Sequence, residues 1–178
     1  MIYSPVPLLG FAAYSGTGKT SLLKRLIPLL RARGLRVGVI KHAHHKVDVD
    51  RPGKDSYELR KAGAGQVLLA TSQRWALMVE EESPGDPDLQ VMLGHLDASR
   101  LDLILVEGFR HVPFPKIELH RPALGRPLLY PDDPSIIALA SDQPLELPAP
   151  LSWLDLNDPA AILDFLQRQV LEKKGGMA

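Results

Sequence analysis

Cysteine is absent from this sequence of 178 residues. Its absence excludes disulfides, iron–sulfur clusters and zinc sites built from thiolates. An excess of charge of one sign is also lacking, because Lys plus Arg and Asp plus Glu number 21 each. The balance argues against a protein that coats nucleic acid through its overall charge. Such a chain is expected to be cytoplasmic and to fold around an ordinary hydrophobic core.

Long apolar runs are missing as well. No stretch approaches the ~20 apolar residues that a membrane helix needs. The first ten residues carry no positive charge and no small-residue cleavage site behind a long apolar run. We therefore expect no membrane span and no targeting segment, and the length suits one domain over residues 1–178.

The clearest motif occupies residues 13–20, Ala-Tyr-Ser-Gly-Thr-Gly-Lys-Thr. A phosphate-binding loop reads Gly, four residues, Gly, Lys and then Ser or Thr, and only Ala13, in place of the first Gly, departs from it. A short apolar run precedes the motif and an amphipathic helical pattern follows it, which is the context that the motif requires. The predicted nucleotide-binding residues are Ser15, Gly16, Thr17, Gly18, Lys19, Thr20 and Ser21.

Two side chains of this loop have distinct predicted roles. Lys19 adds a positive charge that reaches the β- and γ-phosphates and is the first catalytic candidate. The Thr20 hydroxyl is expected to bind Mg²⁺. A carboxylate is needed near that ion, and Glu107 follows the apolar run 101–106, so Glu107 is the predicted metal partner. Asp102 begins the same run and is expected to be structural.

A polar segment rich in His and Asp follows the apolar run 35–40. Ligands of α/β proteins lie at the carboxyl ends of strands, so this segment should border the nucleotide. Asp48 and Asp50 are catalytic candidates for positioning water, and Asp48 is also a metal candidate. The histidines of the segment suit either a transition-metal site or a polar loop, and the loop is favoured because their spacing fixes no ligand set. These histidines are His42, His44 and His45.

The base-recognition signal is weaker than the phosphate signal. One carboxylate can accept hydrogen bonds from both N1–H and the 2-amino group of guanine, which adenine lacks. Asp142 ends the late apolar run 136–140 and is the candidate guanine reader, although a solvated loop Asp explains it equally well. The residues alone do not decide between GTP and ATP.

Strand-like and helix-like segments alternate along the chain, which predicts an α/β fold. We expect a three-layer P-loop NTPase fold, with a mostly parallel sheet, helices on both faces and a β-hairpin extension. The Pro-rich segment 144–150 is expected to be irregular. Strands are expected at 7–13, 35–40, 66–71, 75–80, 101–106, 116–120 and 135–140, and helices from 18 to 34, at 55–61, at 89–96 and from 158.

Four segments in order resemble one family, the molybdopterin-guanine dinucleotide biosynthesis adaptors, or MobB proteins. They are the loop at 13–20, Lys-His-Ala-His-His at 41–45, Asp-Arg-Pro-Gly-Lys-Asp-Ser at 50–56 and Val-Glu-Gly-Phe at 106–109. The second and third segments make the resemblance specific, because many families share the loop. It covers residues 8–142.

The resemblance implies more than the residues do. It implies a protein that binds GTP, hydrolyses GTP weakly, and assists a separate guanylyltransferase that attaches GMP to molybdopterin. Molybdopterin itself is a further candidate partner. The resemblance also implies a homodimer, and the strands between Gln66 and Glu80 are plausible dimer elements, although packing within the chain explains their apolar residues equally well.

Two other functions stay open at this point. A P-loop kinase for a small molecule would need an Arg-rich lid, and Arg60, Arg110 and Arg121 look scattered in the sequence. A metallochaperone GTPase of the nickel type commonly uses Cys with His, and Cys is absent.

Overall fold

The computed structural model of this protein describes residues 2–43, 48–83 and 85–172. Its internal contacts divide the chain into two compact units. The first unit is Met1–His42 with Pro87–Ala178, and the second is Ala43–Asp86. The single nucleotide-binding domain expected over residues 1–178 stays a prediction.

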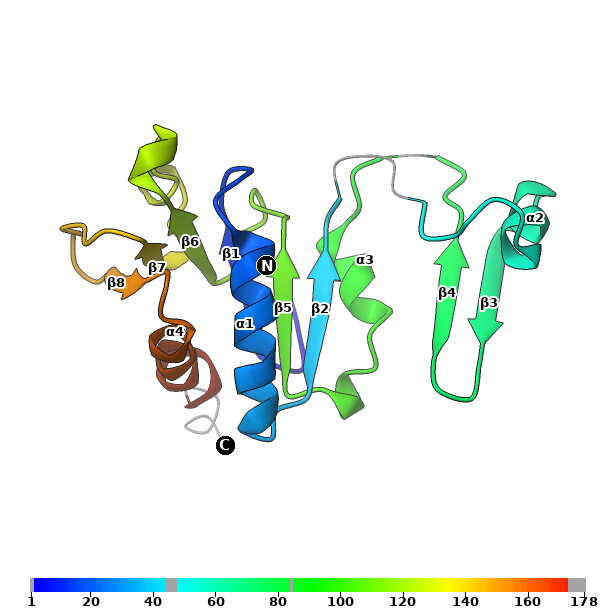
Figure 1. The fold of residues 1–178 in the computed structure, drawn as a ribbon, viewed down its shortest axis with the longest axis horizontal. Helices are drawn as coiled ribbons and strands as arrows, with labels where there is room; N and C mark the ends of the chain where they lie inside the picture. The colour runs from blue at the N-terminus through cyan, green and yellow to red at the C-terminus, as the bar shows by residue number, and fades with distance from the viewer. Residues whose placement is uncertain (1, 44–47, 84, 173–178) are drawn as a thin grey trace. The chain divides into compact units, whose positions relative to one another are not determined.

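A six-stranded sheet forms the centre of the first unit, in the order β2-β5-β1-β6-β7-β8 (Figure 1). Every neighbouring pair in this sheet is parallel. Parallel strands all end at the same edge of a sheet, so the segments that follow β1, β5, β6 and β7 emerge together. The strands are β1 (Leu8–Ala12), β2 (Val37–Lys41), β5 (Leu103–Glu107), β6 (Lys116–His120), β7 (Ile136–Ser141) and β8 (Ser152–Asp155).

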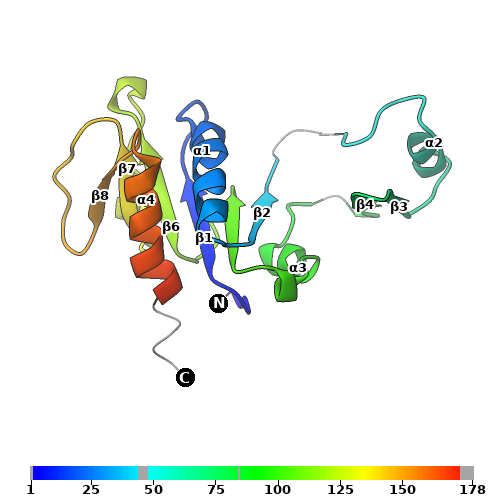
Figure 2. The same cartoon turned by 60° about the horizontal axis from the view of Figure 1, so that its bottom comes forward.

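Helices cover both faces of the sheet. On one face, α1 (Lys19–Ala32) and α4 (Pro159–Leu166) lie side by side (Figure 2). Their apolar residues share a core with Leu9 and Phe11 of β1. On the other face, α3 (Leu89–Gly94) packs over Leu8 of β1. Alternate residues of β1 therefore serve two apolar cores, which explains why the strand is apolar at every position.

Shorter helical turns complete the first unit. A helical turn of π type, η4 (Gln167–Leu171), continues α4. No helix in the described part of the chain is long and apolar enough to cross a membrane. The short 3₁₀ turns are η1 (Ala98–Arg100), η2 (Pro122–Leu124) and η3 (Tyr130–Asp132).

The second unit is a helix followed by a hairpin. It contains α2 (Asp55–Lys61) and the antiparallel strands β3 (Gln66–Ala70) and β4 (Trp75–Val79). The Thr71 side chain accepts hydrogen bonds from the backbone of Gln73 and Arg74 and closes the turn. The predicted hairpin extension is confirmed.

The predicted α/β fold with helices on both faces is also confirmed, and the sheet of the first unit is parallel throughout. One strand was missed. β8 has four residues, of which only Leu154 is buried, so it lacks the apolar run by which the other strands were recognised. The Pro-rich segment before it is irregular, as expected.

Candidate phosphate-binding site

The loop predicted to bind phosphate connects the end of β1 to the start of α1. Gly16 and Gly18 both have positive φ angles, 83° and 104°, which residues with side chains rarely adopt. Gly18 is the N-cap of α1 and brings no side chain to cap it. The first amides of α1 therefore have no side-chain acceptor at this cap, which is the arrangement that binds anions at a helix N-terminus.

Ala13 fits the loop in place of the usual first glycine. Among the described non-glycine residues, positive φ occurs only at Phe109. Ala13 therefore has a backbone conformation that any residue can adopt, and its methyl group packs against the core beside α1. The departure from the motif costs no strain.

Lys19 is held inside the loop. Its Nζ donates to the carbonyl oxygens of Ala13 at 2.9 Å and of Tyr14 at 3.1 Å. Burial lowers the pKa of Lys19, while the negative charge of Glu107 opposes that shift and the positive charges of Lys41 and Arg110 add to it. An ammonium held in this way can exchange carbonyl contacts for phosphate oxygens without a large movement.

Thr20 and Glu107 meet beside the loop. β5 is the direct neighbour of β1, and Phe11 stands opposite Glu107 in the parallel register. The Thr20 hydroxyl donates to Oε1 of Glu107 at 3.5 Å. The Lys41 ammonium lies 3.4 Å from the same oxygen, and Glu107 is largely buried. A hydroxyl beside a carboxylate is an oxygen pair of the kind that Mg²⁺ prefers.

The other predicted loop residues differ in exposure. Ser15, Gly16 and Ser21 are exposed. Thr17 is buried, and its hydroxyl donates to the Tyr14 carbonyl at 2.9 Å. The Thr17 side chain therefore shapes the loop, and its backbone amide is the group left to contact a ligand.

Gly108 allows the end of β5 to approach His42. Its φ angle is 98°, and a methyl group at this position would lie 2.6 Å from Cβ of His42. The His42 amide donates to the Glu107 carbonyl at 2.8 Å, and its ring lies 4.8 Å from that of Phe109. His42 therefore packs on the segment that follows β5.

The structure describes only one of the three histidines for which a transition-metal site and a polar loop were weighed. His44 and His45 lie outside the described residues. Within the part of the chain that the structure describes, no three His, Cys, Asp or Glu side chains gather as a metal site.

Asp142 is linked to the phosphate loop by Arg121, a role that the sequence did not predict for this arginine. Its Oδ2 pairs with Nη1 of Arg121 at 2.7 Å, and Nε of Arg121 donates to the Thr17 carbonyl at 3.0 Å. Oδ1 of Asp142 is buried without a hydrogen-bond partner in the described part of the chain. Both oxygens would have to be uncovered to accept the guanine edge, so a reader role requires Arg121 to move.

Asp48 and Asp50 belong to the second unit. Asp48 pairs with Arg60, whose other terminal nitrogen binds Glu80. Asp50 accepts hydrogen bonds from the Arg51 amide at 2.9 Å and the Ser56 hydroxyl at 3.2 Å. These contacts hold the loop before α2 in place, and the catalytic and metal roles of both aspartates stay predictions.

The description of the arginines as scattered is wrong for two of the three. Arg121 binds the loop carbonyl of Thr17, and the guanidinium carbon of Arg110 lies 5.8 Å from the ring centroid of Tyr14. A third arginine, Arg126, lies 5.7 Å from the same centroid. Arg110 and Arg121 follow the carboxyl ends of β5 and β6, and that placement was the signal available in the sequence.

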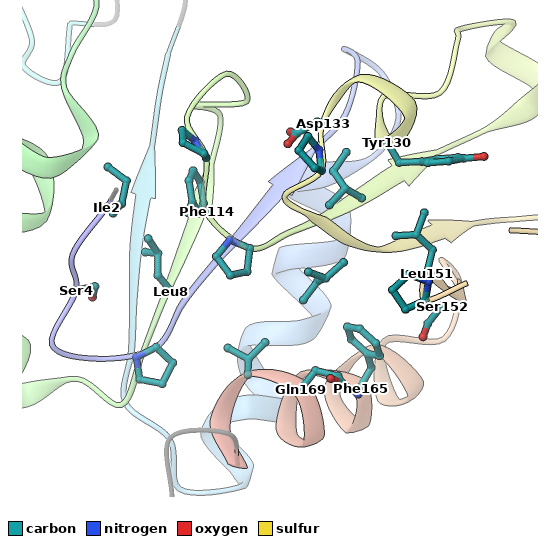
Figure 3. Close-up of a pocket in the computed structure, with 18 of the residues that line it drawn as sticks. Ile2, Ser4, Leu8, Phe114, Tyr130, Asp133, Leu151, Ser152, Phe165 and Gln169 are labelled. Carbon is teal, nitrogen blue, oxygen red and sulfur yellow. The ribbon is translucent and has the colours of Figure 1, made fainter. Parts of the chain in front are cut away.

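A cavity of about 870 Å³ lies at the opposite edge of the sheet. Pro7, Pro115, Ile136 and Ser152 line it where β1, β6, β7 and β8 begin. Figure 3 shows Phe165 projecting from α4 beside this cavity. Its lining includes no residue of the phosphate loop, so the two features are separate.

Sheet order, loop and carboxylate together define an α/β protein of the P-loop class. A sequence profile described as "Molybdopterin guanine dinucleotide synthesis protein B" matches residues 8–142. The chain belongs to this family, MobB.

Known relatives agree with this assignment. The chain is 54% identical over 171 residues to the molybdopterin-guanine dinucleotide biosynthesis adapter protein of Escherichia coli (strain K12), covering 96% of this chain and 97% of the relative. It is 47% identical over 162 residues to the protein of the same name in Haemophilus influenzae, covering 91% and 88%. A crystal structure of molybdopterin-guanine biosynthesis protein B matches with a TM-score of 0.69 at 25% identity, covering 90% and 98%. The predicted family resemblance is confirmed.

Proposed function

We propose that this chain binds GTP with Mg²⁺ and acts as an adapter in molybdopterin-guanine dinucleotide biosynthesis. In this role it assists the guanylyltransferase that attaches GMP to molybdopterin, with molybdopterin as a further candidate contact. The observation that carries the proposal is the contact of Thr20 with Glu107 beside a phosphate loop. It occurs in a chain that is 54% identical to an adapter protein of this pathway.

The oxygen ligands near the loop fit Mg²⁺. The Thr20 hydroxyl would bind the ion directly, and Glu107, whose Oε1 contacts both the Thr20 hydroxyl and the Lys41 ammonium, would bind it through a water. Asp48 is the remaining metal candidate. When bound, Mg²⁺ neutralises charge on the β- and γ-phosphates.

The loop would hold the phosphates through its own backbone and one ammonium. The amides of Gly16 to Thr20 would donate to phosphate oxygens, and Lys19 would exchange its two carbonyl contacts for the β- and γ-phosphates. Hydrolysis would be weak, because charge neutralisation is the main catalytic contribution of these groups. Asp48 and Asp50 are the proposed residues for positioning water.

Preference for guanine would come from Asp142. Its carboxylate follows β7 and is linked to the loop through Arg121. Release of Oδ2 by Arg121 would let both oxygens accept the guanine N1–H and 2-amino group.

A homodimer would form through the hairpin. In the antiparallel register, Leu68 stands opposite Leu77 and Ala70 opposite Trp75, so Leu68, Trp75, Leu77 and Val79 share one face. Leu68 is 62% exposed and Trp75 is 65% exposed. Burying an exposed apolar face of this kind against a partner is favourable, and the proposed partner is the same hairpin of a second copy of the chain. The adapter is proposed to work in the cytoplasm, in line with its cysteine-free sequence.

A reconstituted guanylylation reaction tests the proposal. Purified guanylyltransferase, molybdopterin and GTP would be assayed for dinucleotide product with the wild-type chain, with Lys19→Ala and with neither. The proposal expects the wild type to bind the transferase and raise product formation, and Lys19→Ala to lose the gain. Transfer of phosphate to a nucleoside or pterin, without an effect on the transferase, would instead identify a kinase. Stoichiometric nickel binding would identify a metallochaperone.

A further inference from the structure

Two arginines from separate segments converge on one aromatic ring of the phosphate loop. The guanidinium carbons of Arg110 and Arg126 lie 5.8 Å and 5.7 Å from the ring centroid of Tyr14. Arg110 comes from the segment after β5, and Arg126 comes from the segment between β6 and β7. Both distances are within the ~6 Å over which a cation is attracted to an aromatic face. Tyr14 therefore holds two positive charges at the loop.

Most hydrogen-bond donors of these two arginines have no acceptor in the described part of the chain. Arg110 donates from Nε to Nε2 of His111 at 3.1 Å, which leaves both of its terminal nitrogens without an acceptor in the described part of the chain. Arg126 has no hydrogen bond or carboxylate partner among the described residues, and both side chains are exposed. A guanidinium carries five donors in a planar fork that matches phosphate oxygens.

Arg121 gives the contrast. Its Nε donates to the Thr17 carbonyl, and its Nη1 donates to Oδ2 of Asp142. Its contacts pin the loop to the end of β7, whereas Arg110 and Arg126 make no comparable contacts. The three arginines near the loop thus divide into one that holds structure and two that are free to bind an anion.

The surrounding charges favour an anion with more than one negative charge. Lys41 is neutralised by Glu107 and Arg121 by Asp142. No carboxylate in the described part of the chain is paired with Lys19, Arg110 or Arg126. The Arg110 charge is also near enough to Lys19 to contribute, after burial and Lys41, to the lowered pKa of that ammonium. Arg110 therefore lies beside the ring of Tyr14 and within electrostatic range of Lys19, the residue proposed to contact the terminal phosphates.

We infer that Arg110 and Arg126, held by the ring of Tyr14, contact the γ-phosphate side of the bound nucleotide and make the loop prefer a triphosphate over a diphosphate. The inference rests on the proposed function, because it needs a nucleotide on the loop. The γ-phosphate brings the extra negative charge that two guanidiniums can neutralise, and a diphosphate lacks it. Loss of either arginine should thus weaken triphosphate binding more than diphosphate binding.

Calorimetry with two guanine nucleotides tests this inference. A non-hydrolysable GTP analogue and GDP, each with Mg²⁺, would be titrated into the wild type and into Arg110→Gln and Arg126→Gln. We expect each substitution to lower the affinity for the analogue about tenfold more than the affinity for GDP. Arg168→Gln is the matched control, because Arg168 is also exposed but lies in η4, away from the loop, and it should change neither affinity.

Substitutions of Tyr14 separate an arginine pair held by the ring from two independent surface charges. Tyr14→Phe keeps the aromatic face and should keep the triphosphate preference. Tyr14→Leu keeps both arginines but removes the ring, and it should lose most of the preference.

Each remaining outcome is decisive. An unchanged ratio of analogue to GDP affinity in both arginine variants would overturn the inference and leave nucleotide binding intact. Equal weakening of both nucleotides would also overturn it. A wild-type chain that binds neither nucleotide would overturn the inference and the proposed function together. Where the wild type does bind, Lys19→Ala should lose both nucleotides, which shows that the loop is the binding site.

Discussion

The hydroxyl of Thr20 and the carboxylate of Glu107 lie 3.5 Å apart, although 87 residues separate them in the chain. The adjacency of β1 and β5 causes this contact, since the two strands pair in parallel and end at the same edge of the sheet. The oxygen pair stands directly beside the loop that carries Lys19. It gives the proposed magnesium site two oxygen groups from the first unit, the Thr20 hydroxyl as a direct ligand and the Glu107 carboxylate through a water.

Thr20→Val should remove the effect of Mg²⁺ on nucleotide affinity. Valine keeps the shape of the side chain but has no oxygen for the ion. We expect GTP affinity in Mg²⁺ to fall about tenfold, equivalent to about 1.4 kcal/mol, while affinity in EDTA stays at the wild-type value. Calorimetric titration under both conditions measures the difference. Equal affinities of variant and wild type in Mg²⁺ would remove Thr20 from the metal site.

Asp142→Asn and Arg121→Gln distinguish two roles of the Asp142 carboxylate. If Asp142 reads guanine, Asp142→Asn should lower GTP affinity about tenfold and leave ATP affinity unchanged, because asparagine cannot accept both guanine donors. Arg121→Gln should affect GTP and ATP alike, because it loosens the loop at Thr17. Titration of both variants with both nucleotides gives the answer. Identical effects of the two substitutions would mean that Asp142 only anchors Arg121.

Leu77→Lys should shift the chain from dimer to monomer. The substitution places a charge in the middle of the exposed apolar face of the hairpin, opposite Leu68. Gln73→Lys adds the same charge at the turn, outside the face, and should leave the dimer intact. Sedimentation velocity over a range of concentrations measures both. A wild type that stays monomeric at all concentrations would contradict the proposed homodimer.

Asp102→Asn should lower stability in a pH-dependent way. Asp102 accepts hydrogen bonds from the guanidinium of Arg36 and from its backbone amide, and these bonds, the guanidinium first, lower the pKa of Asp102 from 3.8 to about 2. A lowered acid pKa in the folded state stabilises the protein above the unfolded pKa, and the stabilisation is lost as the pH falls toward about 2. The difference in Tm between wild type and variant should therefore be full at pH 6 and shrink below pH 4, by thermal unfolding followed with circular dichroism. A difference that is constant across this range would contradict the assigned pKa.

Much of this site follows from the sequence, because its main residues obey local rules. The phosphate loop is recognised by its fixed spacing, and Glu107 by its place at the end of an apolar run. Because parallel strands end at the same edge of a sheet, the loop and Glu107 are predicted to lie close together. Arg110 follows the carboxyl end of β5, so the same rule places it at this edge of the sheet. Arg126 follows no such rule, because it stands in an irregular segment whose path is set by tertiary contacts. One of these is the pair of backbone amides, of Leu129 and Tyr130, that donate to the buried Glu118 carboxylate.

Two further features could not be predicted from the sequence pattern, namely strand β8 and the contacts of the loop before α2. β8 is held in the sheet by pairing with β7, and its four residues are too few for a periodic pattern. The loop with Asp48 and Asp50 follows β2 in the sequence, and its position after the carboxyl end of a strand predicts that it borders the nucleotide. Contacts within the second unit engage both aspartates, and their roles at the nucleotide stay predictions.

Calorimetric titration of the wild type and of Lys19→Ala with GTP and with ATP, each with Mg²⁺, tests the central claim most directly. The account predicts that the wild type binds GTP more tightly than ATP and that Lys19→Ala loses binding of both. Binding of ATP as tightly as GTP, or GTP binding that survives Lys19→Ala, would contradict it.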